Sequence, residues 1–332
     1  MTIRIILAVV ILLVLAGIGL WVFGPREPVD TTVTFDPSAI GSDPDAYLAR
    51  TEADVPNLRP DAQKAIVWAY PASRAKTPLT IVYVHGFSAS KEEVRPLPDE
   101  VAKALGANLY FTRLTGHGRN GPAMAEARVN DWINDFAEAL AIAERIGERV
   151  VVVSTSTGGS IATLFAATHP ELMGKVAGLV EISPNFALRD PKAWMLNLPF
   201  ARRLMPWVLD AEYGFEPVNA GQADHWTTRY PSSALLTLGA VTKAAREADV
   251  GAIRTPAFFI TSPADAVVDP DAAEAVLARW GGPHQALQIP VSGDPANHVL
   301  AGQYLSPQTT DELAQRITDW IKQLPAPVAL AR

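Results

Sequence analysis

"VVVSTSTGGS", residues 151–160, joins three valines to a run of small hydroxyl residues and glycines. The valines predict a buried strand, the glycines predict a tight turn, and the "IATLFAATHP" that follows predicts a helix. A strand that turns sharply into a helix can hold one side chain in a strained conformation and present it to a ligand. The stretch offers three serines for that position: Ser154, Ser156 and Ser160.

The segments on either side alternate between strand and helix patterns. Apolar runs that predict strands lie at residues 79–84, 107–114, 175–183 and 256–262, and amphipathic helical segments separate them. This alternation predicts an α/β fold with a mostly parallel sheet and helices on both faces. Residues 187–230 break the rhythm, and we expect them to form a helical cap inserted over the carboxyl ends of the strands.

The N-terminus carries an uncharged apolar run at residues 5–23. Its length suits a helix that spans a bilayer, and the bulky "WVF" at its end does not match the small residues of a signal-peptidase site. We expect a membrane anchor at 1–24, with a cleaved signal peptide as the alternative. Arg4 before the run and the mixed charges after it favour a cytoplasmic N-terminus. The expected location is a bacterial inner membrane, with the rest of the chain on the periplasmic side.

Composition limits the remaining possibilities. Several prolines at residues 25–62 predict a stalk, residues 63–324 form the expected folded domain, and 325–332 a flexible tail. The formal net charge of −7 and the lack of a basic run argue against nucleic acid as a partner. The chain has no cysteine, which excludes disulfides, thiolate metal sites and a cysteine nucleophile.

Ser156 is the serine that best fits the centre of the turn. Small residues stand two positions before it, at Ser154, and two after it, at Gly158, where larger side chains would collide with neighbouring backbone. Ser154 would lie at the strand end and Ser160 on the helix. The alternative interpretation of Ser156 is a helix N-cap.

A carboxylate and an imidazole occur in later loops at the same edge of the sheet. Asp265 follows the strand at 256–262, whereas Asp269 precedes a proline and fits a helix N-cap better. His298 lies in the loop before the last helix, where it could act as a general base near neutral pH. Together these residues predict a triad of Ser156, Asp265 and His298.

Two backbone amides complete the expected site. The turn "HGF" at 85–87 directs the amide of Phe87 inward, and the amide of Thr157 follows the nucleophile directly. Acyl transfer needs two such donors for the developing oxyanion. We interpret His85 as a structural hydrogen-bonding residue.

The chain from about residue 63 to 324 resembles the α/β-hydrolase superfamily, specifically the serine hydrolases related to monoacylglycerol lipases, lysophospholipases and serine aminopeptidases. The resemblance rests on "VHGF" (84–87), "LTGHG" (114–118), "STSTGG" (154–159), "SPADAVVDP" (262–270) and His298. The order serine, aspartate, histidine is that of this superfamily. Ser154 departs from its G-x-S-x-G pattern by replacing the first glycine.

The resemblance implies covalent acyl transfer without a metal or organic cofactor. We expect a membrane-bound serine hydrolase that cleaves carboxylic esters with an apolar acyl part. In the cap, the apolar side chains expected to contact substrate are Trp194, Phe200, Met205 and Trp207. The alternatives are an envelope peptidase or amidase of the same fold, for which Glu212 or Glu216 could grip a substrate amine, and a non-catalytic anchored binding protein.

Overall fold

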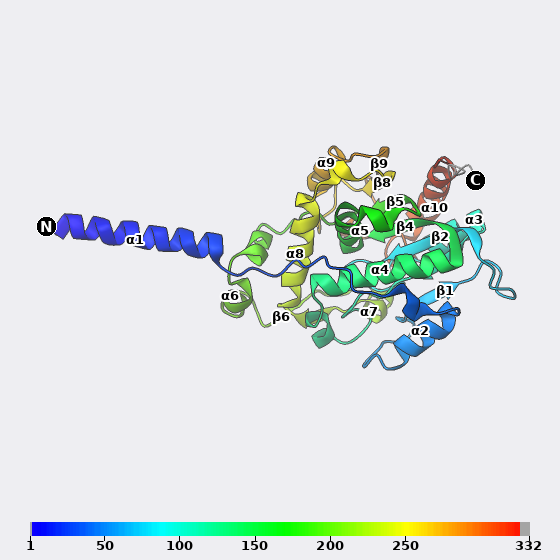
Figure 1. Cartoon of the computed structure of the whole chain (residues 1–332), viewed down its shortest axis with the longest axis horizontal. Helices are drawn as coiled ribbons and strands as arrows, with labels where there is room; N and C mark the ends of the chain where they lie inside the picture. The colour runs from blue at the N-terminus through cyan, green and yellow to red at the C-terminus, as the bar shows by residue number, and fades with distance from the viewer. Residues whose placement is uncertain (1, 326–332) are drawn as a thin grey trace.

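The computed structural model describes residues 2–325, so the tail expected at 325–332 lies almost wholly outside the described residues. A seven-stranded sheet with the order β1-β3-β2-β4-β5-β8-β9 forms the centre of the main body (Figure 1). All neighbouring strands pair in parallel except β1 with β3, which are antiparallel. The strands are β1 (Ala65–Val67), β2 (Thr77–Val84), β3 (Asn108–Phe111), β4 (Gly147–Thr155), β5 (Val176–Ile182), β8 (Ala257–Thr261) and β9 (His284–Gln288).

Helices cover both faces of this sheet, as the alternating pattern predicts. The larger apolar core joins one face to α4 (Val129–Ile146), α5 (Thr157–Thr168), α8 (Ala234–Glu247) and α9 (Pro270–Leu277). The second core joins the other face to α3 (Leu97–Leu105) and α10 (Pro307–Lys322). Successive residues of β2 alternate between the two cores, which explains why that strand is apolar at nearly every position.

The cap lies between β5 and α8. It comprises the 3-10 helix η4 (Ala193–Asn197), α6 (Ala201–Val208), β6 (Glu212–Gly214), α7 (Ala220–His225) and β7 (Arg229–Pro231), and β6 and β7 pair as a separate antiparallel sheet. Its small core consists of Leu196, Ala201 and Met205 packed against Leu236 of α8. The far end of the cap is fastened separately, because Trp226 joins the second core and the guanidinium of Arg59 donates to the carbonyl oxygens of Ala223 and Trp226.

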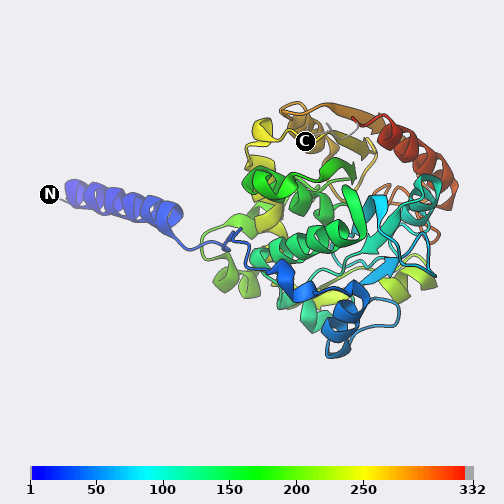
Figure 2. The same ribbon diagram turned by 45° about the vertical axis from the view of Figure 1, so that its right-hand side comes forward.

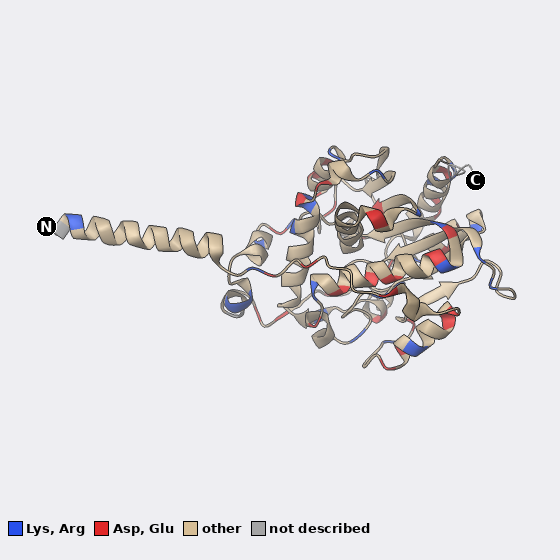
Figure 3. Ribbon diagram, in the orientation of Figure 1, with Lys and Arg blue, Asp and Glu red and all other residues tan. Residues whose placement is uncertain are grey.

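The helix α1 (Thr2–Phe23) projects away from the body in both views (Figures 1 and 2). Residues 3–23 have the length and composition of a membrane span, and none of that window is buried. Arg4 is its only charged residue (Figure 3). A fully exposed apolar helix has no core to pack into, so this one is a candidate for a bilayer span or a signal sequence.

Residues 25–62, for which the sequence suggested a stalk, run along the body and pack on it (Figure 2). They contain η1 (Pro37–Ile40) and α2 (Pro44–Ala53), and Ile40, Tyr47 and Leu48 join the larger core. Two of the prolines, Pro37 and Pro44, stand at the first positions of these helices, where a missing N–H costs nothing.

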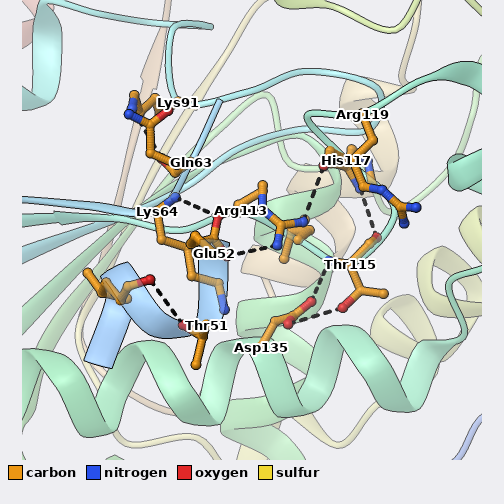
Figure 4. A network of polar contacts seen from close by, with 12 residues as sticks. Thr51, Glu52, Gln63, Lys64, Lys91, Arg113, Thr115, His117, Arg119 and Asp135 are labelled. Carbon is orange, nitrogen blue, oxygen red and sulfur yellow. Dashed lines mark hydrogen bonds and ion pairs between the residues drawn. The ribbon is translucent and has the colours of Figure 1, made fainter. Parts of the chain in front are cut away.

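Buried ion pairs fasten α2 to the body. Glu52 accepts two hydrogen bonds of 2.8 Å from the guanidinium of Arg113, and the amide of Lys64 donates to the same carboxylate (Figure 4). The Lys64 ammonium pairs with Glu138 of α4, which also accepts a 2.6 Å hydrogen bond from Tyr47. Each charge in this group meets an opposite charge, which offsets the loss of hydration.

Candidate active site

Ser156 stands at the turn between β4 and α5 with φ 52° and ψ −116°. A non-glycine residue with positive φ is strained, and the surrounding structure must hold it in place. Here β4 is paired on both sides up to the turn, and α5 begins at the next residue. Gly158 allows α5 to begin this close to β2, because a Cβ at this position would lie 2.3 Å from the carbonyl oxygen of Val84 on β2. The turn therefore holds the Ser156 side chain at the carboxyl edge of the sheet.

The other two serines of the stretch are tied to the backbone. The hydroxyl of Ser154 donates to the carbonyl oxygen of Val180 at 3.2 Å, and that of Ser160 donates to the carbonyl oxygen of Asn185. Both serines are fully buried. Ser154 thus fills the place of the first glycine of the motif without disturbing the pairing of β4 with β5.

His298 and Asp265 meet at the same edge, as the sequence analysis expected. Nδ1 of His298 lies 2.8 Å from Oδ2 of Asp265. The other oxygen of Asp265 accepts the amides of Val267 and Val268 at 2.8 and 2.9 Å. These bonds fix the carboxylate, so it orients the imidazole with the proton on Nδ1 and leaves Nε2 as the basic nitrogen.

Neighbouring acids hold the loop of His298 and shape its titration. Asp294 accepts the amides of His298 and Val299 at 3.0 and 2.9 Å. Burial by itself lowers the pKa of His298, but the charge and hydrogen bond of Asp265, together with the charges of Glu93 and Asp294, outweigh it and raise that pKa. Asp269 instead caps α9 by accepting the amide of Asp271. The helix-cap interpretation of Asp269 therefore agrees with the structure.

The two candidate oxyanion donors lie beside the serine. Phe87 and Thr157 both line the cavity that contains Ser156, and within the described residues neither amide has a hydrogen-bond acceptor. His85 serves the turn instead: Nε2 accepts the amide of Leu114 at 3.1 Å, and Nδ1 donates to the carbonyl oxygen of Gly86 at 2.9 Å. Burial lowers the pKa of His85 to about 4, so the ring stays neutral as a structural residue.

A cavity of about 550 Å³ opens above Ser156 and His298. That volume suits a small organic ligand. The cap and α8 contribute apolar wall residues, which are Leu188, Leu196, Met205, Leu209, Leu235 and Leu238.

Of the four cap residues expected to contact substrate, only Met205 lines this cavity. Trp194 and Trp207 point outward, with 61% and 88% of their surface exposed. Phe200 packs against Gly24 at the end of α1. The helix α6 turns Met205 and Ala201 inward, so Trp207, six positions after Ala201, falls on the opposite side.

Glu93 is a site residue that the sequence analysis missed. It lies in the loop between β2 and α3, lines the cavity, and is 2% exposed. The acidic pair Glu92–Glu93 shortly after "HGF" was visible in the sequence. Nothing in the sequence shows which of the two acids points inward.

Comparisons with known proteins agree with this fold. The model of the family described as serine aminopeptidase, S33, matches residues 75–290. The thermostable monoacylglycerol lipase of Bacillus sp. (strain H-257) is 28% identical over 200 residues, covering 60% of this chain and 76% of the lipase.

Solved structures are also similar. One is that of the metagenome-derived lipolytic enzymes LipS and LipT, with a TM-score of 0.65, 22% identity, and coverage of 80% of this chain and 99% of the other. A soluble variant of the monoglyceride lipase of Saccharomyces cerevisiae has a TM-score of 0.59, 12% identity, and coverage of 80% and 92%. Because the family model spans more than half of the sequence, this chain belongs to the serine aminopeptidase S33 family and is a serine hydrolase with the α/β-hydrolase fold.

Proposed function

We propose that the protein is a membrane-anchored hydrolase that cleaves carboxylic esters with an apolar acyl part through an acyl-enzyme. The observation that carries this proposal is the strained Ser156 on the wall of an apolar cavity that also contains His298, itself hydrogen-bonded to Asp265. The relatives described as monoacylglycerol lipase and lipolytic enzymes support an ester as substrate.

In this mechanism His298 removes the proton of Ser156 as the serine oxygen attacks the ester carbonyl carbon. The amides of Phe87 and Thr157 donate to the resulting oxyanion, and Asp265 stabilises the imidazolium. His298 then gives the proton to the leaving alcohol, which leaves an acyl group on Ser156. Water, deprotonated by His298, releases the acid and restores the serine.

The surroundings of α1 support attachment to a membrane. The carbonyl oxygen of Pro25 accepts the amide of Phe200, and Glu27 accepts two hydrogen bonds from Arg202 of α6. The end of α1 is therefore joined to the cap. The outer face of α6 exposes Leu204, Trp207 and Val208, which would meet the bilayer surface beside the anchor.

We place the catalytic domain on the periplasmic side of a bacterial inner membrane, since Arg4 precedes the span. Extraction of membranes with alkaline carbonate and the mass of the mature N-terminus test the anchor. Retention in the membrane with residues 1–24 intact supports it. Release of a protein that lacks these residues would show a cleaved signal sequence.

A peptidase that binds a substrate amine is the second candidate. The cap side of the cavity carries four carboxylates, from Asp190, Asp210, Glu212 and Glu216, and one ammonium, from Lys192. Such a wall could hold a cation beside the scissile bond. The family description as serine aminopeptidase also favours this candidate.

The first experiment treats the full-length protein in detergent with a fluorophosphonate probe and locates the adduct by peptide mass spectrometry. We expect labelling at Ser156 and none in Ser156→Ala, with Ser154→Ala as the matched control that keeps labelling. A series of p-nitrophenyl esters and aminoacyl amides then separates the two functions. Faster turnover of the amides would overturn the ester assignment, and absence of labelling would overturn the nucleophile.

A further inference from the structure

Glu93 is a buried carboxyl group that the proposed mechanism does not use. Its Oε2 accepts the amide N–H of Gly86 at 2.7 Å and the hydroxyl of Tyr83 at 2.7 Å. Gly86 directly precedes Phe87, whose amide is the candidate oxyanion donor. We call residues 85–87, which carry this donor, the oxyanion loop. The carboxyl group therefore holds the backbone of this loop at the residue before Phe87.

Glu93 and Ser156 both approach Gly86 closely. A methyl group added to Gly86 would lie 2.7 Å from Oε1 of Glu93 and 3.2 Å from Cβ of Ser156. The carboxyl group and the serine thus flank the same glycine Cα, and only a glycine allows both to approach. Among the described residues, no lysine or arginine forms an ion pair with Glu93.

A buried carboxyl group without a cation is costly for a fold, and a neutral side chain would pack there more cheaply. We propose that Glu93 is a positioning residue that holds the oxyanion loop through Gly86 and, as a buried acid on the wall of the cavity that His298 also lines, supports the protonated form of His298 through its charge. This inference rests on the proposed role of His298 as the general base.

The charged groups that act most strongly on His298 are all acids, while the nearest guanidinium, that of Arg189, donates to the backbone carbonyl oxygen of Asp265 at 2.8 Å. Asp265 faces it from the loop after β8, Asp294 from its own loop after β9, and Glu93 from the loop after β2. Around Glu93 itself, Tyr83 of β2 and His298 are the titratable neighbours. Burial raises the pKa of Glu93, while the bonds from Gly86 and Tyr83 and the charge of His298 act against that rise. A proton on His298 and a charge on Glu93 therefore favour each other.

The decisive experiment compares two isosteric variants of the full-length protein in detergent, with a soluble short-chain ester as substrate. Glu93→Gln keeps an oxygen for the Gly86 amide and removes the charge. Glu92→Gln is the matched control, because Glu92 is also buried but pairs with Arg95. We expect Glu93→Gln to move the acid limb of the kcat/KM profile toward lower pH by about half a unit or more, and Glu92→Gln to leave it in place.

The hydrogen bond to Gly86 is tested separately with Glu93→Ala. Loss of the acceptor frees the loop, so kcat should fall about 100-fold with little change in KM, as for a misplaced oxyanion donor. Glu93→Gln should keep kcat at its plateau within about tenfold of the wild type, since it rescues the acceptor. Thermal unfolding of each variant shows whether it folds. If Glu93→Ala does not fold, the pH profile of Glu93→Gln decides alone.

An unmoved acid limb in folded Glu93→Gln, with active wild-type enzyme labelled at Ser156, would overturn the inference and leave the proposed function standing. A wild-type protein without labelling or activity would instead remove the proposed function itself.

Discussion

Two groups of buried charges occupy the same domain and differ in their balance. The N-terminal cluster joins Glu52, Lys64 and Arg113, which lie together in Figure 4, to Glu138, with two acids against two cations. The site cluster has three acids around one imidazole. Its acids are Glu93, Asp265 and Asp294, and the imidazole is that of His298.

The difference lies in when the charges are compensated. In the N-terminal cluster each carboxylate is paired with a lysine or arginine of the fold itself, so the cluster fastens α2 to the body. In the site cluster a compensating charge arises only when His298 takes up a proton. A cluster short of cations favours proton uptake, whereas a balanced cluster favours a fixed contact.

The largest expected effect tests the site cluster. Asp265→Asn keeps the shape of the side chain but can favour the wrong tautomer of His298, and we expect kcat/KM to fall about 10³- to 10⁴-fold. Steady-state kinetics with an ester substrate measures it. Asp269→Asn, in the same loop, is the control and should stay within about threefold of the wild type. A loss of less than tenfold in Asp265→Asn would contradict the assignment of Asp265.

The next effect tests the N-terminal cluster. Arg113→Met leaves the carboxylate of Glu52 buried without its cation, so the free energy of unfolding should fall by about 3–5 kcal/mol. Urea unfolding measures this change, and the double variant Glu52→Leu/Arg113→Met should recover most of it. Arg316→Met breaks an exposed pair with Glu312 and should change stability by less than about 1 kcal/mol. Equal decreases in the free energy of unfolding of the two arginine variants would show that the buried pair contributes no more to stability than the exposed pair.

The smallest expected effect is a difference in how the stability contributions of His298 and Glu52 depend on pH. We take His298 first. Its pKa in the folded protein is raised above the ordinary value of 6.5. Its contribution to stability is therefore complete below pH 6.5 and is lost as pH rises through the folded pKa. The stability difference between wild type and His298→Asn should shrink as pH rises above 6.5.

Glu52 should show the opposite trend. Burial alone raises its pKa, but the hydrogen bonds and charge of Arg113 and the charge of Lys64 lower it below the ordinary 4.5. Its contribution is complete above pH 4.5 and is lost as pH falls through the folded pKa. Urea unfolding of Glu52→Gln and His298→Asn across pH measures both trends. Parallel trends in the two variants would remove the proposed contrast between the clusters.

Sequence reasoning succeeded where a local pattern has one physical meaning. The residues around Ser156 have to be small because β2 passes within contact distance of the turn, and Gly158 shows this directly. Asp265 and His298 follow parallel strands, whose carboxyl ends share one edge of the sheet. The sheet therefore brings together loops that lie far apart in the chain.

Sequence reasoning did less well where a residue contacts a segment that is distant in the chain. Prolines at residues 25–62 suggested a stalk, whereas Glu52 finds Arg113 sixty-one residues later. In the cap, an apolar composition could not show that Met205 faces the cavity while Trp207 faces outward. Glu93 was equally hidden, because its bonds to Tyr83 and Gly86 depend on how one loop folds back.

The sequence by itself determined the alternation of strands and helices, the strained turn at Ser156, the order of the three candidate catalytic residues and the apolar run at 5–23. These features depend on residue size, periodicity and hydropathy over a few neighbouring positions. Only the tertiary structure decided which acids surround His298, which face of the cap lines the cavity and how residues 25–62 pack. Those outcomes depend on burial and charge pairing between distant segments, and such contacts exist only after the chain has folded.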